Sequence, residues 1–586
     1  MSARTDQETA RTFGDRGMGF GRPTAKAWPS RWFHGSILVG LAWLAVLALH
    51  PPAAQAVAGC KQLRGGSEPP CNPHLAQSRW SASHRGSYAQ GSSPNRGLRS
   101  GRVSTQHIDL PGTPIQIQFS QPYPDGGRVA WGSLVDAFDR RIVFKAGVNS
   151  GRLIDLYVPE EREQNPPPPG AGGITGAYNM LDRGGRFIVP RQRFFDVFED
   201  AANDRVNSPI ALRKRFFLPE RAFCGPDDVL VGATMTYDGY VAFATERGVV
   251  GTVPRKPRQM TAANLRAIAI NRDCDLPDEQ LETVSNNIAA DEKGGIYVVS
   301  SSRMRRFDHD SAKNRLSSRW QARYQAGSEV SEIRLGAGSG STPSLMGTGN
   351  GQDRFVVITD GQDLMHLDLF WRDRPPNDWN GMGGGRPRRM ACEYPVRFGD
   401  RNATSSLSEQ SVAVRGYGNL LVNNELDYEF PDGLTETLRT AQAALRGGDP
   451  DSAPKGMERI DWDPEKRRCR SVWNNREVSV PNGIPSISGR SGTAYGIEQR
   501  AGEWGVGGLN WKSGKSRFFA RSDQQQCSDE ALGIFERTGI LPILQPTLDE
   551  LPGSCQNSFY AATEIGPARS IWTGTFYGMT IYRPDG

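Results

Sequence analysis

Two segments of the chain repeat the same interval between an apolar residue and a tryptophan, and this interval constrains the fold more than any other feature. Phe307 opens a segment that runs to Trp320, and Ile460 opens a similar segment that runs to Trp473, thirteen residues in each case. A third copy starts at Leu509 and has Ser522 where the Trp would stand. Each copy carries a turn of the type Asp/Asn-x-x-x-x-Lys, so we expect one outer hairpin to recur along the chain.

An inner hairpin precedes these segments. Residues 229–236 and 240–245 flank Asp238-Gly239, a dipeptide typical of tight hairpin turns. Similar pairs of short apolar runs occupy 287–299, 411–422 and 485–496. Repeats of this size cannot bury a hydrophobic face alone, and four short strands per repeat favour radial stacking. We therefore predict an all-β fold, a β-propeller of seven or eight four-stranded blades with irregular insertion loops, over residues 103–586.

Ring closure and insertions follow from the same pattern. Residues 570–582 are expected to complete a sheet begun near 103–119. The repeats are longer than a bare blade of roughly 40–50 residues, so loops must absorb the excess. We expect such loops at 166–170, 381–389 and 434–446, the last with one short surface helix.

The outer hairpin also carries a family resemblance. Leu509-Asn510-Trp511-Lys512-Ser513-Gly514-Lys515 resembles the Asp-x-x-Thr-Gly-Lys turn of the pyrroloquinoline-quinone-type propeller repeat, in which a following Trp docks against the next blade. From about Cys224 to Tyr582 the chain resembles secreted bacterial quinoprotein-type β-propeller proteins of unassigned function, through scaffold motifs at 340–347, 355–360 and 420–424. The sequence lacks the adjacent cysteine pair and the Cys-x-x-Cys-His motif of true quinoprotein dehydrogenases, so the resemblance implies a fold rather than a reaction.

The N-terminus predicts export. Residues 36–49 are uncharged and apolar, shorter than the roughly 20 residues of a membrane span, and are followed by Ala56-Val57-Ala58, a sequence typical of signal peptidase sites. We interpret residues 1–58 as a signal peptide. The alternatives are an uncleaved N-terminal membrane anchor or lipidation at Cys60. All three interpretations place the body outside the cytoplasm, in the periplasm, in the cell envelope or secreted.

The eight cysteines predict disulfide bonds. None forms a Cys-x-x-Cys pair that would suggest zinc or redox chemistry. We predict sequential pairing: Cys60–Cys71, Cys224–Cys274, Cys392–Cys469 and Cys527–Cys555.

The net charge of +6 is unevenly distributed along the chain. Residues 1–58 carry +3 and residues 59–102 carry +6, which leaves −3 for residues 103–586. A body so close to neutral gives no electrostatic reason to bind nucleic acid. Residues 59–102 are rich in Ser, Gly and Pro and are predicted to be a disordered basic linker, whose charge permits contact with an anionic envelope surface. Contact with a membrane is expected only through the N-terminal segment, if it is uncleaved or lipidated.

Few residues suit hydrolytic catalysis. Only His107, His309 and His366 follow residue 102, whereas zinc hydrolases need two or three His ligands and a Ser-His-Asp site needs one well-placed His. We expect His309, in the repeated outer turn, to face solvent. The catalytic residues, if any, stay unknown.

Polar residues stand just before the predicted inner strands, and these are the candidate site at the channel mouth: Asn287, Thr342, Glu409, Gln410, Asn482 and Asn557. If the strand starts converge, their oxygens surround the axis. They either satisfy backbone groups at strand ends or bind calcium, with Glu409 as the charged ligand and Asn287 and Asn482 as neutral ligands.

Two hypotheses of function remain open. The first is a secreted or envelope-associated, non-catalytic propeller that binds a protein or polymer partner through its insertion loops. The second is a calcium-dependent propeller hydrolase resembling lactonases, or a quinoprotein-like sugar oxidoreductase, acting at the channel mouth.

Overall fold

The computed structural model describes residues 67–76, 80, 84–136, 142–159, 176–202, 205–327, 338–434 and 436–585. The predicted signal peptide or anchor, residues 1–58, and the loop at 166–170 lie outside these residues. No helix of the described residues is both long and apolar enough to span a bilayer.

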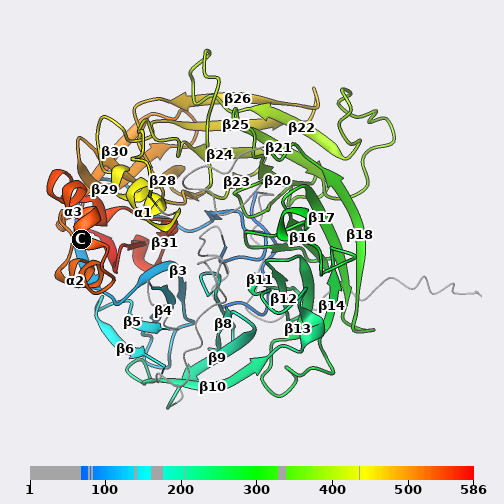
Figure 1. Cartoon of the computed structure of the whole chain (residues 1–586), viewed down its shortest axis with the longest axis horizontal. Coiled ribbons are helices and arrows are strands. Elements are labelled where there is room, and N and C mark those ends of the chain that lie inside the picture. Colours follow the sequence, from blue (N-terminus) through cyan, green and yellow to red (C-terminus); the bar gives the residue numbers. More distant parts are fainter. Residues whose placement is uncertain are drawn as a thin grey trace, which may run out of the picture. The chain divides into compact units, whose positions relative to one another are not determined.

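Eight antiparallel sheets form a ring, which is a β-propeller (Figure 1). Blades 1 to 4 run from the inner to the outer strand as follows: β3 (Thr113–Phe119), β4 (Val129–Val135), β5 (Val143–Gly147) and β6 (Leu153–Tyr157); β7 (Met180–Leu181), β8 (Phe187–Arg191), β9 (Phe194–Asp200) and β10 (Ile210–Phe217); β11 (Leu230–Met235), β12 (Tyr240–Thr245), β13 (Val249–Pro254) and β14 (Arg266–Ala269); β15 (Ala289–Ala290), β16 (Gly295–Val299), β17 (Arg303–Asp310) and β18 (Arg315–Arg323).

Blades 5 to 8 continue in the same order: β19 (Ser344–Met346), β20 (Phe355–Thr359), β21 (His366–Trp371) and β22 (Met390–Pro395); β23 (Ala413–Arg415), β24 (Gly418–Val422), β25 (Met457–Asp463) and β26 (Arg468–Asn475); β27 (Ser486–Ser488), β28 (Thr493–Arg500), β29 (Glu503–Asn510) and β30 (Ser516–Arg521); β31 (Glu564–Ile565), β32 (Ile571–Thr575), β33 (Gly578–Pro584) and β2 (Val103–Asp109). A short strand, β1 (Ser92–Ser93), pairs in parallel with β27.

The ring closes by pairing of the two ends of the propeller. β2 lies antiparallel to β33, from Val103 opposite Pro584 to Asp109 opposite Gly578. The N-terminal strand is thus the outer strand of the blade whose other three strands come from the C-terminus. This confirms the closure expected from residues 103–119 and 570–582.

The repeated interval marks equivalent positions in three blades. Phe307, Ile460 and Leu509 each lie on the third strand of a blade, where its register with the outer strand shifts. The Trp320 indole donates to the Arg372 carbonyl of the next blade at 3.3 Å, and the Trp473 indole donates to the Trp511 carbonyl of the next blade at 2.9 Å. The interval therefore encodes a docking contact between neighbouring blades, as the resemblance implied.

The expectation for His309 is wrong. Its side chain is fully buried, with Nδ1 2.9 Å from Asp238 Oδ2 and the ring 4.4 Å from that of Tyr240. Asp238 belongs to the turn between β11 and β12 of the preceding blade, so His309 joins two blades. Trp462, at the equivalent position of blade 6, donates to Asp353 of blade 5 at 2.9 Å. The position contacts the neighbouring blade rather than solvent.

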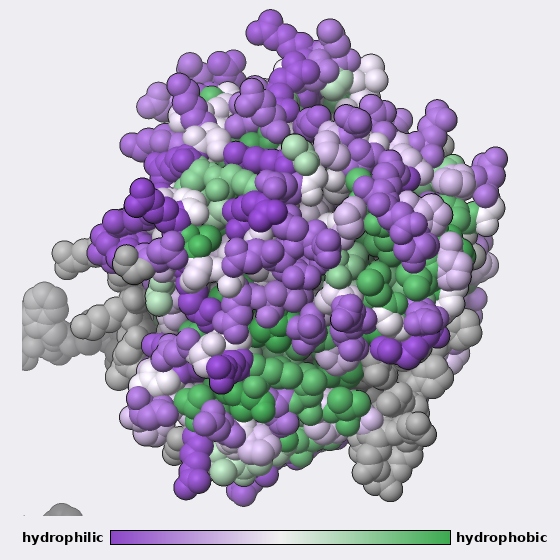
Figure 2. All heavy atoms as spheres, turned by 90° about the vertical axis from the view of Figure 1, so that its left-hand side faces the viewer, coloured by the Kyte–Doolittle hydropathy of each residue, from purple (hydrophilic) through white to green (hydrophobic). Residues whose placement is uncertain are grey.

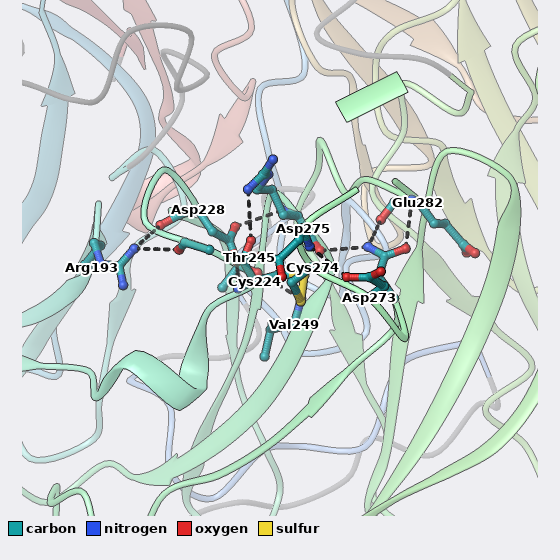
Figure 3. Close-up of a disulfide and its surroundings, with 12 residues drawn as sticks. Arg193, Cys224, Asp228, Thr245, Val249, Asp273, Cys274, Asp275 and Glu282 are labelled. Atoms are coloured by element: carbon teal, nitrogen blue, oxygen red, sulfur yellow. Dashed lines mark hydrogen bonds between the residues drawn. A yellow bond between two sulfur atoms is a disulfide. The ribbon is translucent and has the colours of Figure 1, made fainter. Parts of the chain in front are cut away.

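Three of the predicted disulfides are confirmed: Cys224–Cys274, Cys392–Cys469 and Cys527–Cys555. Cys392 on β22 and Cys469 on β26 join the outer strands of blades 5 and 6. Figure 3 shows Cys224–Cys274, beside which the Asp228 carboxylate accepts the backbone N–H groups of Cys224 and Arg247, both at 2.8 Å. The predicted partner of Cys71, Cys60, lies outside the described residues. The three disulfides fit an extracytoplasmic protein.

Two insertions carry the helices α1 (Glu436–Arg446), α2 (Asp529–Arg537) and α3 (Leu541–Glu550). The first insertion lies between β24 and β25 and confirms the short helix expected at 434–446. The second lies between β30 and β31, is tied by Cys527–Cys555, and had no counterpart in the predictions. Residues 381–389 form the predicted loop, between β21 and β22.

Four short 3-10 helices complete the secondary structure of the described residues: η2 (Glu220–Ala222), η3 (Asp278–Gln280), η4 (Ser554–Gln556) and η5 (Pro567–Arg569).

The described residues between 67 and 102 are not arranged as the disordered linker that their composition predicted. Most of residues 84–98 are buried, and Ser92 and Ser93 form β1. Figure 1 shows this part of the chain in blue, inside the ring. We call residues 84–98 the axial strap.

Candidate functional site

The axial strap is hydrogen-bonded to the inner strands of four consecutive blades. Its carbonyl oxygens accept backbone N–H groups in blade order: Ser87 from Ala290 at 2.7 Å, Tyr88 from Leu345 at 2.9 Å, Gln90 from Val414 at 2.7 Å, Gly91 from Ile487 at 2.9 Å and Ser93 from Gly489 at 2.8 Å. The free edge of an inner strand presents unpaired backbone groups, and here the strap pairs with them. The space that a propeller leaves along its axis is therefore occupied by this chain's own backbone.

Arg85 of the strap and residues that precede the strap extend these contacts to blades 1, 2 and 3. The Asn72 side chain donates to the Met235 carbonyl of blade 3 at 3.0 Å, and the Ala76 N–H donates to Leu181 of blade 2 at 3.0 Å. The Arg85 guanidinium donates to the Ala76 carbonyl at 3.0 Å and to the Phe119 carbonyl of blade 1 at 3.2 Å. The chain thus contacts blades 1 to 7 before β2 enters blade 8.

Two buried tyrosines stand at the end of the axis where the inner strands begin. The Tyr178 hydroxyl lies next to the Thr342 side chain and the Asn287 backbone, and burial raises the pKa of Tyr178. Burial raises the pKa of Tyr560 as well, and the negative charge of Glu409 adds to this effect. Tyr560 has a φ of 53°, an uncommon backbone conformation for a bulky residue. Residues of blades 2, 4, 5, 6 and 8 therefore meet at this end.

The predicted mouth residues form two groups. Asn287, Thr342 and Glu409 lie around the two tyrosines, whereas Asn557 donates to Asn482 Oδ1 at 2.6 Å and to the Ala444 carbonyl at 2.6 Å. Asn287 Oδ1 accepts the Ala233 N–H at 2.8 Å. These contacts match the interpretation that amide side chains satisfy backbone groups at strand starts.

The remaining mouth residues are buried. The Glu409 carboxylate lies so close to Gly340 that a Cβ added there would stand 2.1 Å from Oε2. The Gln410 side chain is 2% exposed, and its amide has no hydrogen-bond partner in the described residues. Among those residues no group of three or more His, Cys, Asp or Glu side chains could hold a metal ion. The metal role of Glu409, Asn287 and Asn482 stays a prediction.

Three ionisable residues of the axial region were missed by the sequence analysis. His84 is buried with its ring 4.8 Å from that of Tyr178, and burial lowers its pKa to about 3. Glu564 Oε1 accepts the Ile117 N–H at 2.6 Å, and burial raises the Glu564 pKa to about 8 against the opposing charge of Arg85. Burial lowers the pKa of Arg85 to about 10. At neutral pH, Arg85 is charged, His84 is neutral and Glu564 is mostly protonated.

Tyr178 and Tyr560 precede inner strands, as the polar candidates do. This position in the sequence could have identified them as residues of the channel mouth. His84 and Arg85 carried no such sign because they lie in the segment interpreted as a linker.

The helices lie on the face where the inner strands begin, because the loops β24–β25 and β30–β31 both emerge there in an antiparallel blade. Leu445 of α1 packs with Leu544 and Leu548 of α3, and Arg446 pairs with Glu550 at 2.9 Å. Figure 2 views the side of the ring that carries these helices and shows a largely hydrophilic surface with hydrophobic areas. The propeller thus has helices on one face, and the strap lies along its axis.

Solved structures similar to this chain include quinohemoprotein alcohol dehydrogenase from Comamonas testosteroni, with 11% identity, a TM-score of 0.47 and coverage of 87% of this chain and 80% of that one. A europium-containing methanol dehydrogenase has 10% identity, a TM-score of 0.47 and coverage of 86% and 97%. A functionally unknown protein from Desulfotomaculum acetoxidans has 10% identity, a TM-score of 0.34 and coverage of 66% and 94%.

No family model matches the chain. A protein of Archaeoglobus fulgidus, described only as uncharacterized, is 42% identical over 514 residues, which are 88% of this chain and 89% of that protein. Identity of this extent includes most of the ring rather than one repeat. The chain belongs to the same protein family as this Archaeoglobus fulgidus protein.

Proposed function

We propose that this protein is an extracytoplasmic, non-catalytic β-propeller that binds a protein or polymer partner through the loops of its helix-bearing face. The observation that carries the proposal is the axial strap. Within the described residues, five strap carbonyls accept backbone N–H groups of the inner strands, so the strap occupies the part of the axis where a substrate would have to bind.

The mouth residues support the same proposal. The side chains of Asn287, Asn482 and Asn557 already bond to protein groups, and Glu409 lies 5% exposed against Gly340. A hydrolase or oxidoreductase would need polar groups that reach substrate. Here these groups hold neighbouring blades together.

The helix-bearing face supports a binding role. Its second insertion is closed by Cys527–Cys555, and Ser528 caps the N-terminus of α2, where its hydroxyl accepts the Ala531 N–H at 3.2 Å. A disulfide and a capped helix restrict the conformations of a loop, which reduces the entropy lost when a partner binds. Loops fixed on a rigid scaffold are common binding sites.

The first experiment tests the alternative of catalysis at the mouth. Purified protein is analysed for bound metal and titrated with calcium while its melting temperature is followed, for the wild type and for Glu409→Gln. We expect no stoichiometric calcium and equal melting curves with and without calcium. A tightly bound ion that is lost in Glu409→Gln would overturn the non-catalytic proposal.

The second experiment tests the binding face. A photo-crosslinking amino acid replaces Ile543 on α3, which is 40% exposed, or Phe217 at the outer edge of blade 2, which is 59% exposed, as a matched control. We expect one discrete adduct from position 543 in the native host envelope and none from position 217. Equal adduct patterns at both positions would refute a partner site on the helix-bearing face.

A further inference from the structure

A basic cavity opens on the opposite face of the propeller, next to the end of the axial strap. It has a volume of about 260 Å³ and is lined by Trp80, Asn95, Arg96, Arg490, Gly566, Ala568 and Arg569. Arg490 lies in the turn between β27 and β28, and Arg569 lies in the turn between β31 and β32. These turns leave the inner strands at their far ends, so the cavity is on the face away from the helices.

The backbone on both sides of Arg96 is fixed by the turn that carries Arg490. The Ser488 hydroxyl donates to the Asn95 carbonyl at 2.6 Å, and the Gly97 N–H donates to the Ser491 hydroxyl at 3.2 Å. Strap and turn therefore hold the two arginines beside each other. The chain builds this arrangement from segments almost 400 residues apart.

The arginines at the cavity lack a paired carboxylate among the described residues. Within the part of the chain that the structure describes, the guanidinium groups of Arg96, Arg99, Arg490 and Arg569 make no hydrogen bond or ion pair. Other arginines close by are partnered: Arg415 pairs with Glu68, and Arg517 donates to the Ser491 carbonyl at 2.9 Å. The charges of Arg99, Arg490 and Arg569 all lower the pKa of Arg96, Arg99 most, with a contribution from burial.

The turn that carries Arg569 has an unusual backbone. Ala568 and Arg569 have φ values of 53° and 66°, in the left-handed region that disfavours residues with a side chain. Two such residues in succession cost stability, of the order of 1–3 kcal/mol each. This turn places the Arg569 guanidinium near Arg96, Arg99 and Arg490, whose positive charges already repel one another.

We propose that this cavity binds a phosphate-type oxyanion, as the free ion or as the phosphate of a small phosphomonoester. Guanidinium groups match the oxygens of phosphate in paired hydrogen bonds, and three of them line the cavity. Trp80 supplies an apolar wall for an organic portion of the ligand. The cavity is several times the roughly 30 Å³ share of one water molecule, so it has room for such a group. The site is on a different face from the proposed partner loops and does not depend on them.

Binding is tested on the full chain by calorimetric titration with inorganic phosphate and with glucose 6-phosphate at constant ionic strength, with sodium chloride as the reference. We expect saturable binding with one site per chain and a rise in melting temperature that follows its occupancy. Tighter binding of glucose 6-phosphate identifies a phosphomonoester as the better ligand, and equal binding identifies the free ion. The absence of saturable binding of both phosphates would overturn the proposal.

Two variants locate the site. Arg490→Gln removes one donor and should weaken phosphate binding about tenfold or more, as expected for hydrogen bonds to charged groups. Arg569→Gly removes a second donor and also suits the left-handed φ, so it should fold at least as well as the wild type. Arg323→Gln, an equal charge change at an exposed position of β18, is the control and should bind phosphate like the wild type. Unchanged affinity in both cavity variants would overturn the assignment.

Discussion

Replacing Tyr88 by Ala tests whether the axial strap is an integral part of the ring. Tyr88 is 1% exposed and belongs to the hydrophobic core between blades 4 and 5, with Leu345 and Val356. Its ring lies 6.1 Å from that of Tyr237 and 5.1 Å from the guanidinium carbon of Arg372. Its hydroxyl donates to Glu292. If the strap is threaded as described, removal of this side chain leaves a cavity in a closed core.

The magnitude follows from these contacts. Truncation of a fully buried aromatic residue costs about 3–5 kcal/mol of unfolding free energy. Loss of the ring also removes the cation–π contact to Arg372, worth up to about 2 kcal/mol when desolvated. At about 2.1 cal/mol/K per residue, roughly 500 folded residues give an unfolding entropy near 1 kcal/mol/K, so we expect the melting temperature to fall by about 3–7 °C.

Circular dichroism at a fixed scan rate measures the change. Tyr88→Phe keeps the ring and loses only the hydrogen bond to the partly exposed Glu292 carboxylate, so its unfolding free energy should fall by about 1.5 kcal/mol. Phe217→Ala, at an aromatic side chain that is 59% exposed, should change stability by less than about 0.5 kcal/mol. Two results together would refute the placement of the strap. Tyr88→Ala would have the same melting temperature as Phe217→Ala, and protease would cleave its N-terminal segment no faster than that of the wild type.

Two further predictions concern charge and covalent links. The pKa of Glu564 is about 8 in the folded chain against an ordinary 4.5, so the folded state holds this proton more tightly than the unfolded state does. The stability that the bound proton gives is fully present below pH 4.5 and is lost as the pH rises toward 8. Glu564→Gln should therefore gain stability over the wild type by up to about 1.4 kcal/mol per pH unit between pH 5 and 8, in melts across that range; parallel curves would contradict it. Replacing both Cys392 and Cys469 by Ser removes a disulfide between residues 77 positions apart and should cost about 4.5 kcal/mol of unfolding free energy in the chain-entropy model. The loss is measured against the wild type under oxidising conditions, and no loss would show that the outer strands of blades 5 and 6 gain nothing from the bond.

The repeat could be predicted from sequence because its signs are local. The turn, the bulged third strand and the docking Trp of blades 4 and 6 lie within about fourteen residues of each other, so their spacing survives in the sequence. Blades 1 and 2 have no such interval, which left the number of blades open. His309 shows the limit of this reasoning, since its place in a turn pattern said nothing about Asp238 of the preceding blade.

The strap could not be predicted for a different reason. Its contacts use backbone carbonyls, which every residue has, and the partners lie 200 to almost 400 residues away. Ser, Gly and Arg are typical of disordered segments, yet small residues also fit where a chain passes between closely spaced inner strands. The mouth residues were proposed because polar residues precede several inner strands. These residues contact one another only because the ring is closed. The sequence of a single repeat does not encode this closure.

The path of the strap explains why the two faces of the ring differ. The strap backbone pairs with the free edges of the inner strands and makes the centre of the ring rigid. The loops on the two faces are therefore the parts that remain for binding. The face where inner strands begin carries the two helical insertions and the disulfide Cys527–Cys555. The strap ends at the opposite face, where Arg96 and the nearby Arg99 come close to the turns that hold Arg490 and Arg569. The positive charge of residues 59–102 is thus partly gathered at one folded site, where an anion would relieve the repulsion that the fold imposes.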